Sequence, residues 1–163
     1  MNYLVEKCPK LGSFYLEIIR WTNDPISIRL VRENVAIGRT MLKPGRKLIM
    51  PYRPMHYDTH VFGDNAEDFD ALRFFRNKKL EHHKSFRPFG GGAMYCPGRV
   101  LARREVYMFV VLALTRFDIK LVSPDGGEPK MPTLDETIPS GGILPPKPGH
   151  DVIVQLREAE RAR

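Results

Sequence analysis

Two segments of the chain carry apolar residues at the spacing of one helix face. The first is residues 11–22, which Pro25 ends; its apolar positions are Leu11, Phe14, Tyr15, Ile18 and Ile19. The second and stronger segment is residues 97–117, where Pro97 suits the first helical position because its missing N–H costs nothing there. Its apolar stripe consists of Val106, Phe109, Val110, Ala113, Leu114 and Phe117. The pattern therefore predicts two amphipathic helices.

The other regular structure is predicted to be short strands. Between residues 26 and 51 the runs ISIRLV, VAIG and KLIMPY are β-prone, and LKPGRK supplies a turn. Residues 117–122 (FDIKLV) and 152–158 (VIVQLRE) predict two further strands. Residues 52–88 are irregular, with one helical turn expected near residues 66–69. A long segment of this kind normally carries function or wraps around something.

Composition is that of a globular domain. The 163 residues are 42% hydrophobic and 28% charged, which is enough for one domain with a core. The longest uncharged apolar stretch, residues 106–115, is shorter than the roughly 20 residues that a bilayer requires. The N-terminus is not a secretory signal, and two cysteines are too few for a disulfide framework. We therefore expect an intracellular chain with free thiols and no membrane segment.

The net charge of +7, from 26 basic and 19 acidic residues, indicates an acidic partner or simply a solvated basic surface. Nucleic acid is not expected, because acidic residues are interspersed among the basic ones and no nucleic-acid module pattern occurs. Arg99, Arg103 and Arg104 cluster at the start of the second helix, where positive charge opposes the helix dipole. This cluster suggests a nearby anion or an acidic partner.

The stretch PFGGGAMYCPGR, residues 88–99, places Cys96 between three glycines and the start of a helix. The positive end of the helix dipole and nearby N–H groups favour the thiolate, which can act as a nucleophile, a redox centre or a metal ligand. No Cys–His signature supports a nucleophile. Glycines let the backbone pass close beneath a large planar cofactor, so a ligand accounts better for the loop.

The motif Phe89-x-x-Gly92-x-x-x-Cys96-x-Gly98 resembles the haem-binding loop of the cytochrome P-450 family. In that family the cysteine thiolate is the proximal ligand of the haem iron. The resemblance implies that Cys96 is the axial ligand, which favours O–O cleavage, and that Phe89 shields its sulfur. It also implies that Gly92 and Gly98 give the backbone room beneath the macrocycle.

Three further features occur in the order of the family. Glu17-x-x-Arg20 in the first predicted helix is similar to the Glu-x-x-Arg helix of the family. The segment FDALRF, residues 69–74, resembles the segment whose arginine, here Arg73, joins that pair in a buried triad. The stretch DPISIR, residues 24–29, resembles the one whose arginine, here Arg29, binds a haem propionate. The resemblance extends from residue 8 to residue 157.

One difference from the family pattern and one further likeness refine this identification. Met94 stands where the family usually has Arg or His bonded to a propionate, and a methionine cannot make that bond. The runs CPGRVLARREV and ILPPKPGHDVIV are most similar to fungal and sterol-type members. The resemblance implies a mainly α fold with small β-sheets (α+β), namely the C-terminal, haem-binding part of the P-450 fold over residues 1–163.

The resemblance also implies partners. A small apolar organic substrate would contact the segments that carry Ile26, Ile28, Ile143 and Leu144, although an ordinary turn and hairpin tip explain these segments equally well. A flavin-containing P-450 reductase, which brings electrons from NADPH, would dock on a basic surface rather than a merely soluble one. The residues expected there are Arg87, Arg99, Arg103 and Arg104, with Lys78, Lys79 and Lys84 nearby.

Two hypotheses about the whole chain follow. In the first it is part of a haem-thiolate monooxygenase that inserts one oxygen atom of O2 into an organic substrate. In the second it is a truncated, non-catalytic fragment or pseudo-enzyme that binds no haem by itself. The N-terminal helices of the family and its distal oxygen-activating helix are not found in the sequence. A full-length eukaryotic parent would lie at the endoplasmic reticulum membrane.

Overall fold

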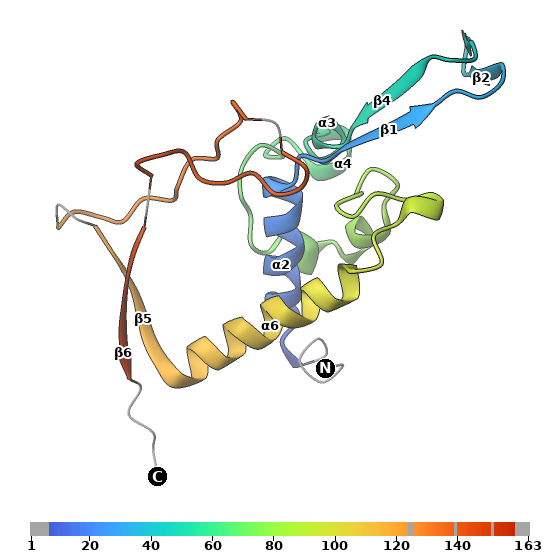
Figure 1. Cartoon of the computed structure of the whole chain (residues 1–163). Coiled ribbons are helices and arrows are strands. Elements are labelled where there is room, and N and C mark those ends of the chain that lie inside the picture. The colour runs from blue at the N-terminus through green and yellow to red at the C-terminus, as the bar shows by residue number, and fades with distance from the viewer. Residues whose placement is uncertain (1–6, 124–125, 139, 151, 159–163) are drawn as a thin grey trace. The chain divides into compact units, whose positions relative to one another are not determined.

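The computed structural model describes residues 7–123, 126–138, 140–150 and 152–158 of the chain (Figure 1). The chain divides into two compact units. The N-terminal unit comprises Asn2–Tyr95 and Ser140–Ile143, and the C-terminal unit comprises Cys96–Pro139 and Leu144–Arg163. The boundary between them falls immediately before Cys96.

Helix α2 (Pro9–Thr22) is the principal helix of the N-terminal unit and confirms the helix predicted at residues 11–22. It begins two residues earlier than predicted, with a proline in its first turn, where no N–H is lost. Its buried face is not purely apolar: Tyr15, Leu16 and Ile19 are buried, and so are Glu17 and Arg20. The helix therefore brings an ion pair into the core of its unit.

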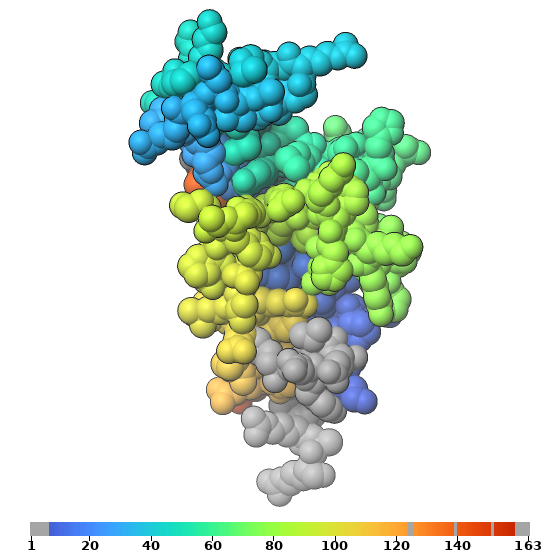
Figure 2. All heavy atoms as spheres, turned by 90° about the vertical axis from the view of Figure 1, so that its right-hand side faces the viewer, coloured from blue at the N-terminus to red at the C-terminus, as the bar shows by residue number. Residues whose placement is uncertain are grey.

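A projecting β-ribbon follows α2, and it confirms the strands predicted between residues 26 and 51. Strand β1 (Ile26–Leu30) pairs antiparallel with β4 (Lys47–Pro51), and β2 (Val35–Ile37) pairs with β3 (Thr40–Leu42) at the tip. The ribbon extends away from the rest of its unit (Figure 1; blue to cyan in Figure 2). Because side chains alternate along a strand, Ile26, Ile28 and Ile49 share one face, and they are 52–58% exposed.

The segment 52–88 is more regular than the sequence predicted. It contains the short helices α3 (Arg53–His56), α4 (Thr59–Phe62) and α5 (Arg73–Arg76) and the 3₁₀ helix η1 (Lys78–His82). The helical turn expected near residues 66–69 is wrong: the chain makes hydrogen-bonded turns there, in which the N–H of Ala66 donates to the carbonyl of Gly63 and the N–H of Asp68 to that of Asn65. No helix forms because the carbonyl groups of residues 65–68 accept hydrogen bonds from side chains.

Aromatic rings form the core beneath these short helices. The ring of Phe74 lies 4.9 Å from that of Phe86 and 6.5 Å from that of Phe62, measured between centroids. All three side chains are at most 8% exposed. Such aromatic contacts stabilise a core through both burial and ring geometry.

The C-terminal unit consists of one long helix and one strand pair. Helix α6 (Arg99–Arg116) leads directly into β5 (Phe117–Val122), which pairs antiparallel with β6 (Ile153–Glu158). The helix begins two residues later than predicted, because Pro97 and Gly98 form a turn, and Phe117 belongs to the strand. The apolar stripe of α6 is exposed, with Phe109 at 73% and Leu114 at 63%. In the described part of the chain, no helix combines the length and apolarity needed to cross a bilayer.

The aromatic core generates a first prediction. Replacing Phe74 with alanine should lower the free energy of unfolding by about 3–5 kcal/mol, because a buried ring leaves a cavity behind. The neighbouring Phe75 is 40% exposed, so Phe75→Ala should cost much less, of the order of 1 kcal/mol or below. Urea unfolding of both variants measures the difference, and equal losses would contradict the core described here.

Candidate functional site: a buried charge network and a cysteine loop

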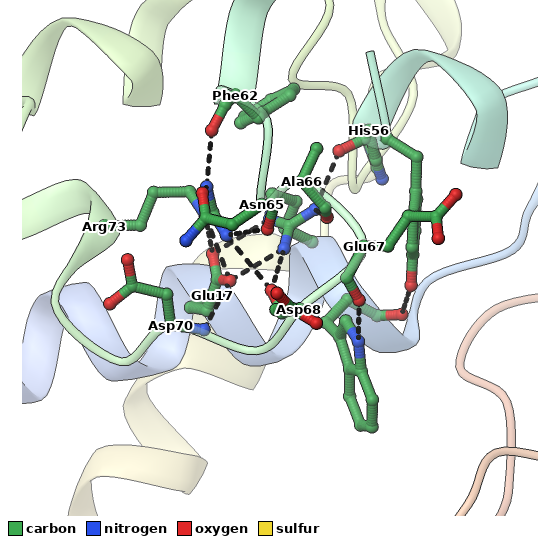
Figure 3. A network of polar contacts seen from close by, with 12 residues as sticks. Glu17, His56, Phe62, Asn65, Ala66, Glu67, Asp68, Asp70 and Arg73 are labelled. Carbon is green, nitrogen blue, oxygen red and sulfur yellow. Dashed lines mark hydrogen bonds and ion pairs between the residues drawn. The ribbon is translucent and has the colours of Figure 1, made fainter. Parts of the chain in front are cut away.

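The structure brings Glu17, Arg20 and Arg73 together, as the resemblance implied (Figure 3). Glu17 and Arg20 lie three residues apart on α2, and both are fully buried. The two carboxylate oxygens of Glu17 accept hydrogen bonds from Nη2 and Nε of Arg20 at 2.7 and 2.9 Å. Arg73, from α5, donates its Nε–H to the same two oxygens at 3.2 Å. One carboxylate therefore serves two guanidinium groups.

The remaining donors of Arg20 reach main-chain carbonyl groups. Its Nη1 donates to the carbonyl oxygens of His56 at 2.8 Å and Ala66 at 2.7 Å, and its Nη2 donates to that of Asp68 at 3.1 Å. All five N–H groups of the guanidinium are thus used. The rings of Tyr57 and Phe62 lie 5.4 and 5.3 Å from its carbon Cζ, so aromatic faces also surround the charge.

Arg73 is satisfied in the same way. Its Nη1 donates to the carbonyl oxygen of Phe62 and to Oδ1 of Asn65, and its Nη2 donates to the carbonyl oxygens of Asn65 at 2.8 Å and Asp68 at 3.0 Å. The main chain of residues 62–68 therefore forms a cage of carbonyl oxygens around the two guanidinium groups (Figure 3). We call this set the charge network.

The cage explains why no helix forms near residues 66–69. The carbonyl groups of Asn65, Ala66 and Asp68 bind Arg20 or Arg73, and that of Glu67 accepts from Nε1 of Trp21 at 3.1 Å. A helix would direct these four oxygens along its axis toward its own N–H groups. No side chain signals this arrangement in the sequence, because a main-chain carbonyl group is the same in every residue.

His56 connects the network to Arg87, which lies just before the glycine-rich stretch of residues 88–99. Its side chain is fully buried, and its Nε2 accepts a hydrogen bond from the main-chain N–H of Arg87 at 2.9 Å. Burial lowers the pKa of His56 from 6.5 to about 4, and the positive charges of Arg20 and Arg53 act in the same direction. His56 was not predicted as a site residue, because its partner lies 31 residues further along the chain.

The glycine loop contains two residues that require glycine. Gly90 and Gly92 have φ angles of +76° and +63°, in the left-handed region that side chains disfavour. The 3₁₀ turn η2 (Gly92–Met94) follows, and Phe89 before it is partly buried. The side chain of Met94, which departs from the family pattern, is 71% exposed.

Cys96 opens the C-terminal unit. It forms no disulfide, is partly buried, and lies three residues before α6. Its carbonyl oxygen accepts from Nη1 of Arg99 at 2.9 Å and weakly from the N–H of Arg99 at 3.5 Å. A Cβ on Gly98 would stand 3.8 Å from the sulfur, at ordinary van der Waals distance. Cys96 therefore stands immediately before the short turn that leads into α6.

The other predicted residues are placed as follows. The segments expected at the substrate are side by side, because Asn23 bridges Ile143 and the N–H of Asp24 donates to the carbonyl of Gly142 at 2.7 Å. Ile143 is 60% exposed, whereas Leu144 is 2% exposed and belongs to the C-terminal unit. Arg29 donates only to the carbonyl of Ile28 among the described residues, at 2.9 Å.

Three of the four arginines expected at a docking surface have local roles. Arg87 donates its Nε–H to the carbonyl of Lys84 at 2.9 Å, and Arg99 binds Cys96 as described. Arg103 donates to the hydroxyl of Tyr107 at 3.2 and 3.3 Å. Arg104 is exposed, as are Lys78, Lys79 and Lys84.

Comparison with known proteins identifies the family. A family model of cytochrome P450 matches residues 17–152, so the chain belongs to the cytochrome P450 family. A cytochrome P450 monooxygenase of Gibberella zeae is 35% identical over 129 aligned positions, and the alignment covers 73% of this chain and 25% of that protein. A 7-alpha-hydroxycholest-4-en-3-one 12-alpha-hydroxylase of Homo sapiens is 29% identical over 169 aligned positions, and the alignment covers 94% of this chain and 32% of that protein. The predicted likeness to fungal and sterol-type members is confirmed.

A solved structure shows the same fold. The cyanobacterial CYP120A1 with bound retinoic acid matches with a TM-score of 0.74 and 21% identity, over 98% of this chain and 34% of that one. The prediction of an α+β P450 fold is confirmed. The chain spans about a quarter to a third of the length of these relatives.

The charge network predicts that arginine cannot be replaced by lysine. Arg20→Lys should lower the free energy of unfolding by about 2–4 kcal/mol, because three lysine donors cannot satisfy acceptors that five N–H groups now serve. Arg76, whose side chain is 57% exposed beside Asp70, provides the matched control. Arg76→Lys should change the free energy by less than about 0.5 kcal/mol in the same unfolding experiment. Similar values for both variants would contradict the network.

His56 predicts a pH dependence. The native state holds it neutral down to about pH 4, whereas the unfolded chain protonates near pH 6.5, so stability is full above pH 6.5 and falls toward pH 4. His56→Gln should therefore flatten the loss of stability between pH 6.5 and 4, and the exposed control His60→Gln should leave it unchanged. Chemical unfolding at several pH values measures this. An unaltered pH profile in His56→Gln would rule the assignment out.

Proposed function

We propose that the chain is the haem-binding part of a cytochrome P450 monooxygenase, with the thiolate of Cys96 as the axial ligand of the iron. The observation that carries this proposal is a cysteine without a disulfide, partly buried beside a glycine at the start of the longest helix, in a chain of this family. When bound, haem supplies the redox chemistry that inserts one oxygen atom of O2 into an organic substrate.

The residues around the sulfur fit such a group. Gly98 leaves the space next to the sulfur without a side chain, since its missing Cβ would lie 3.8 Å away. The two hydrogen bonds of Arg99 to the carbonyl of Cys96 hold the turn that presents the sulfur. In the N-terminal unit, Arg29 has no acidic partner among the described residues, so its guanidinium is available to a propionate.

The remaining residues have supporting roles in this proposal. Glu17, Arg20 and Arg73 keep the segment before the loop folded, Phe89 shields the sulfur, and Gly92 provides the turn. The exposed side chains of Ile26, Ile28 and Ile143 support a small apolar substrate, to which Leu144 contributes only through packing.

Electron delivery would depend on a basic surface where a reductase docks. A flavin-containing P450 reductase, reduced by NADPH, would dock through exposed Arg104 and the lysines near the loop, and long-range attraction would speed the encounter. Arg87, Arg99 and Arg103 would contribute charge while keeping their local bonds. A full-length parent with this partner would lie at the endoplasmic reticulum membrane.

A second candidate is a chain without turnover of its own. The observation that favours it is the exposed apolar surface of α6 and the ribbon, where Phe109 is 73% and Ile28 56% exposed. Surfaces of this kind mark contacts with other protein segments. Under this candidate the 163 residues fold and present Cys96 but do not hydroxylate a substrate alone.

The axial ligand is testable with a matched control. After reconstitution with haem, the reduced chain should give the carbon monoxide difference spectrum of a thiolate-ligated iron. Cys96→Ser should abolish that band, because a hydroxyl does not ionise to bind iron as a thiolate does. Cys8→Ser removes the other, exposed thiol and should leave the spectrum intact. A band that survives in Cys96→Ser would refute the proposed ligand.

A further inference from the structure

Two consecutive main-chain groups just before the glycine loop are held by buried side chains. The N–H of Arg87 donates to Nε2 of His56 at 2.9 Å, and the carbonyl oxygen of Pro88 accepts from Nδ2 of Asn23 at 2.6 Å. Asn23 caps the C-terminus of α2, and His56 ends α3. Two elements far apart in sequence therefore converge on residues 87 and 88. We call His56 and Asn23 the loop clamp.

The clamp residues are buried although each uses only part of its hydrogen-bonding capacity. His56 is 0% and Asn23 5% exposed. Nδ1 of His56 and Oδ1 of Asn23 are the buried side-chain polar atoms without a partner in the described part of the chain. Burying an unpaired polar atom lowers the stability of the fold, so stability alone does not account for a histidine and an asparagine at these positions. Each side chain instead forms one hydrogen bond to the main chain: His56 to residue 87 and Asn23 to residue 88.

The clamp is tied to fixed points. The carbonyl group of His56 accepts from Nη1 of Arg20 in the charge network, at 2.8 Å. Asn23 is paired with Ile143 through a β-bridge. Residues 87 and 88 are therefore connected by hydrogen bonds to the most deeply buried part of the N-terminal unit.

The clamp acts on the loop through Arg87. The guanidinium of Arg87, whose Nε–H is bonded to Lys84, lies over the backbone of Gly91, where a Cβ would collide with it. Gly90 donates its N–H to the carbonyl of Arg87 at 3.1 Å. Fixing residues 87 and 88 thus fixes the path of residues 90 and 91, five residues before Cys96.

We propose that His56 and Asn23 are positioning residues that set the path of residues 87–91 and so the presentation of Cys96; its functional meaning rests on the proposed role of that thiol. The polarity of each contact is specific. His56 must accept a hydrogen bond, which only its neutral form with the proton on Nδ1 does, and Asn23 must donate one. Removing the acceptor or reversing the donor releases the loop and leaves the charge network folded.

Amide hydrogen exchange of the full 163-residue chain without haem, resolved by residue with NMR, tests the clamp. His56→Leu should accelerate exchange at the N–H of Arg87 at least about 10-fold, because that N–H loses its acceptor. Asn23→Asp should accelerate exchange at the N–H of Gly90 by a similar factor, because a carboxylate repels the Pro88 carbonyl. In both variants the N–H of Asp70, which donates to Glu17 at 2.9 Å, should keep its rate.

Matched controls separate the clamp from general effects. His60→Leu and Asn77→Asp make the same changes at exposed positions and should alter none of these rates. His56→Gln, which retains an acceptor, should restore at least part of the protection at Arg87. Equal acceleration at Arg87 and Asp70 in every clamp variant, or none at Arg87 and Gly90, would overturn the proposal.

The effect of the clamp on Cys96 is measured by the reactivity of its thiol. In a Cys8→Ser background, the rate at which a neutral thiol reagent modifies Cys96 should change at least about threefold in His56→Leu and in Asn23→Asp, and in neither control. An unchanged rate beside accelerated amide exchange would show that the effect of the clamp does not extend to Cys96 and would overturn its positioning role. None of these readouts involves haem, so they stand or fall separately from the spectrum of Cys96→Ser.

Discussion

The N-terminal unit depends on how one buried carboxylate and two buried guanidinium groups are satisfied. Glu17 offers two oxygens to Arg20 and Arg73, whose ten N–H groups need far more acceptors. The side-chain oxygen of Asn65 supplies one of the others, and the main chain of His56 and residues 62–68 supplies the rest. Since a helix or strand would use these carbonyl oxygens itself, the segment that supplies them has to be irregular. An uncompensated buried charge is costly, so each member of the network requires the others.

The same arrangement connects the core of the unit to the cysteine loop. His56 gives its carbonyl group to Arg20 and its Nε2 to the N–H of Arg87, and thus belongs to both. Arg87 in turn lies against Gly91. In the proposed function the loop meets a rigid cofactor and would need such support, because small displacements of a ligand weaken its bond. The long segment between α2 and the loop is therefore a scaffold rather than a spacer.

Much of the candidate site was predictable because its residues have distinctive types at short spacing. Glu17 and Arg20 lie three residues apart, and Phe89, Gly92, Cys96 and Gly98 fall within ten residues. His56 and Asn23 could not be found in this way, since their partners are main-chain groups 31 and 65 residues distant. The local bonds of Arg99 and Arg103 were also not predicted, although their partners, the carbonyl group of Cys96 and the hydroxyl of Tyr107, lie only three and four residues away.

The sequence by itself determined the family, the two long helices, the strand pairs and the residues of the motifs, because periodicity and side-chain type are local properties. The tertiary structure alone decided where residues 62–68 turn their carbonyl groups, which histidine is held neutral, and that α6 begins at Arg99. These features are set by main-chain groups, which are chemically alike in every residue and become specific only when folding brings a distant donor to them.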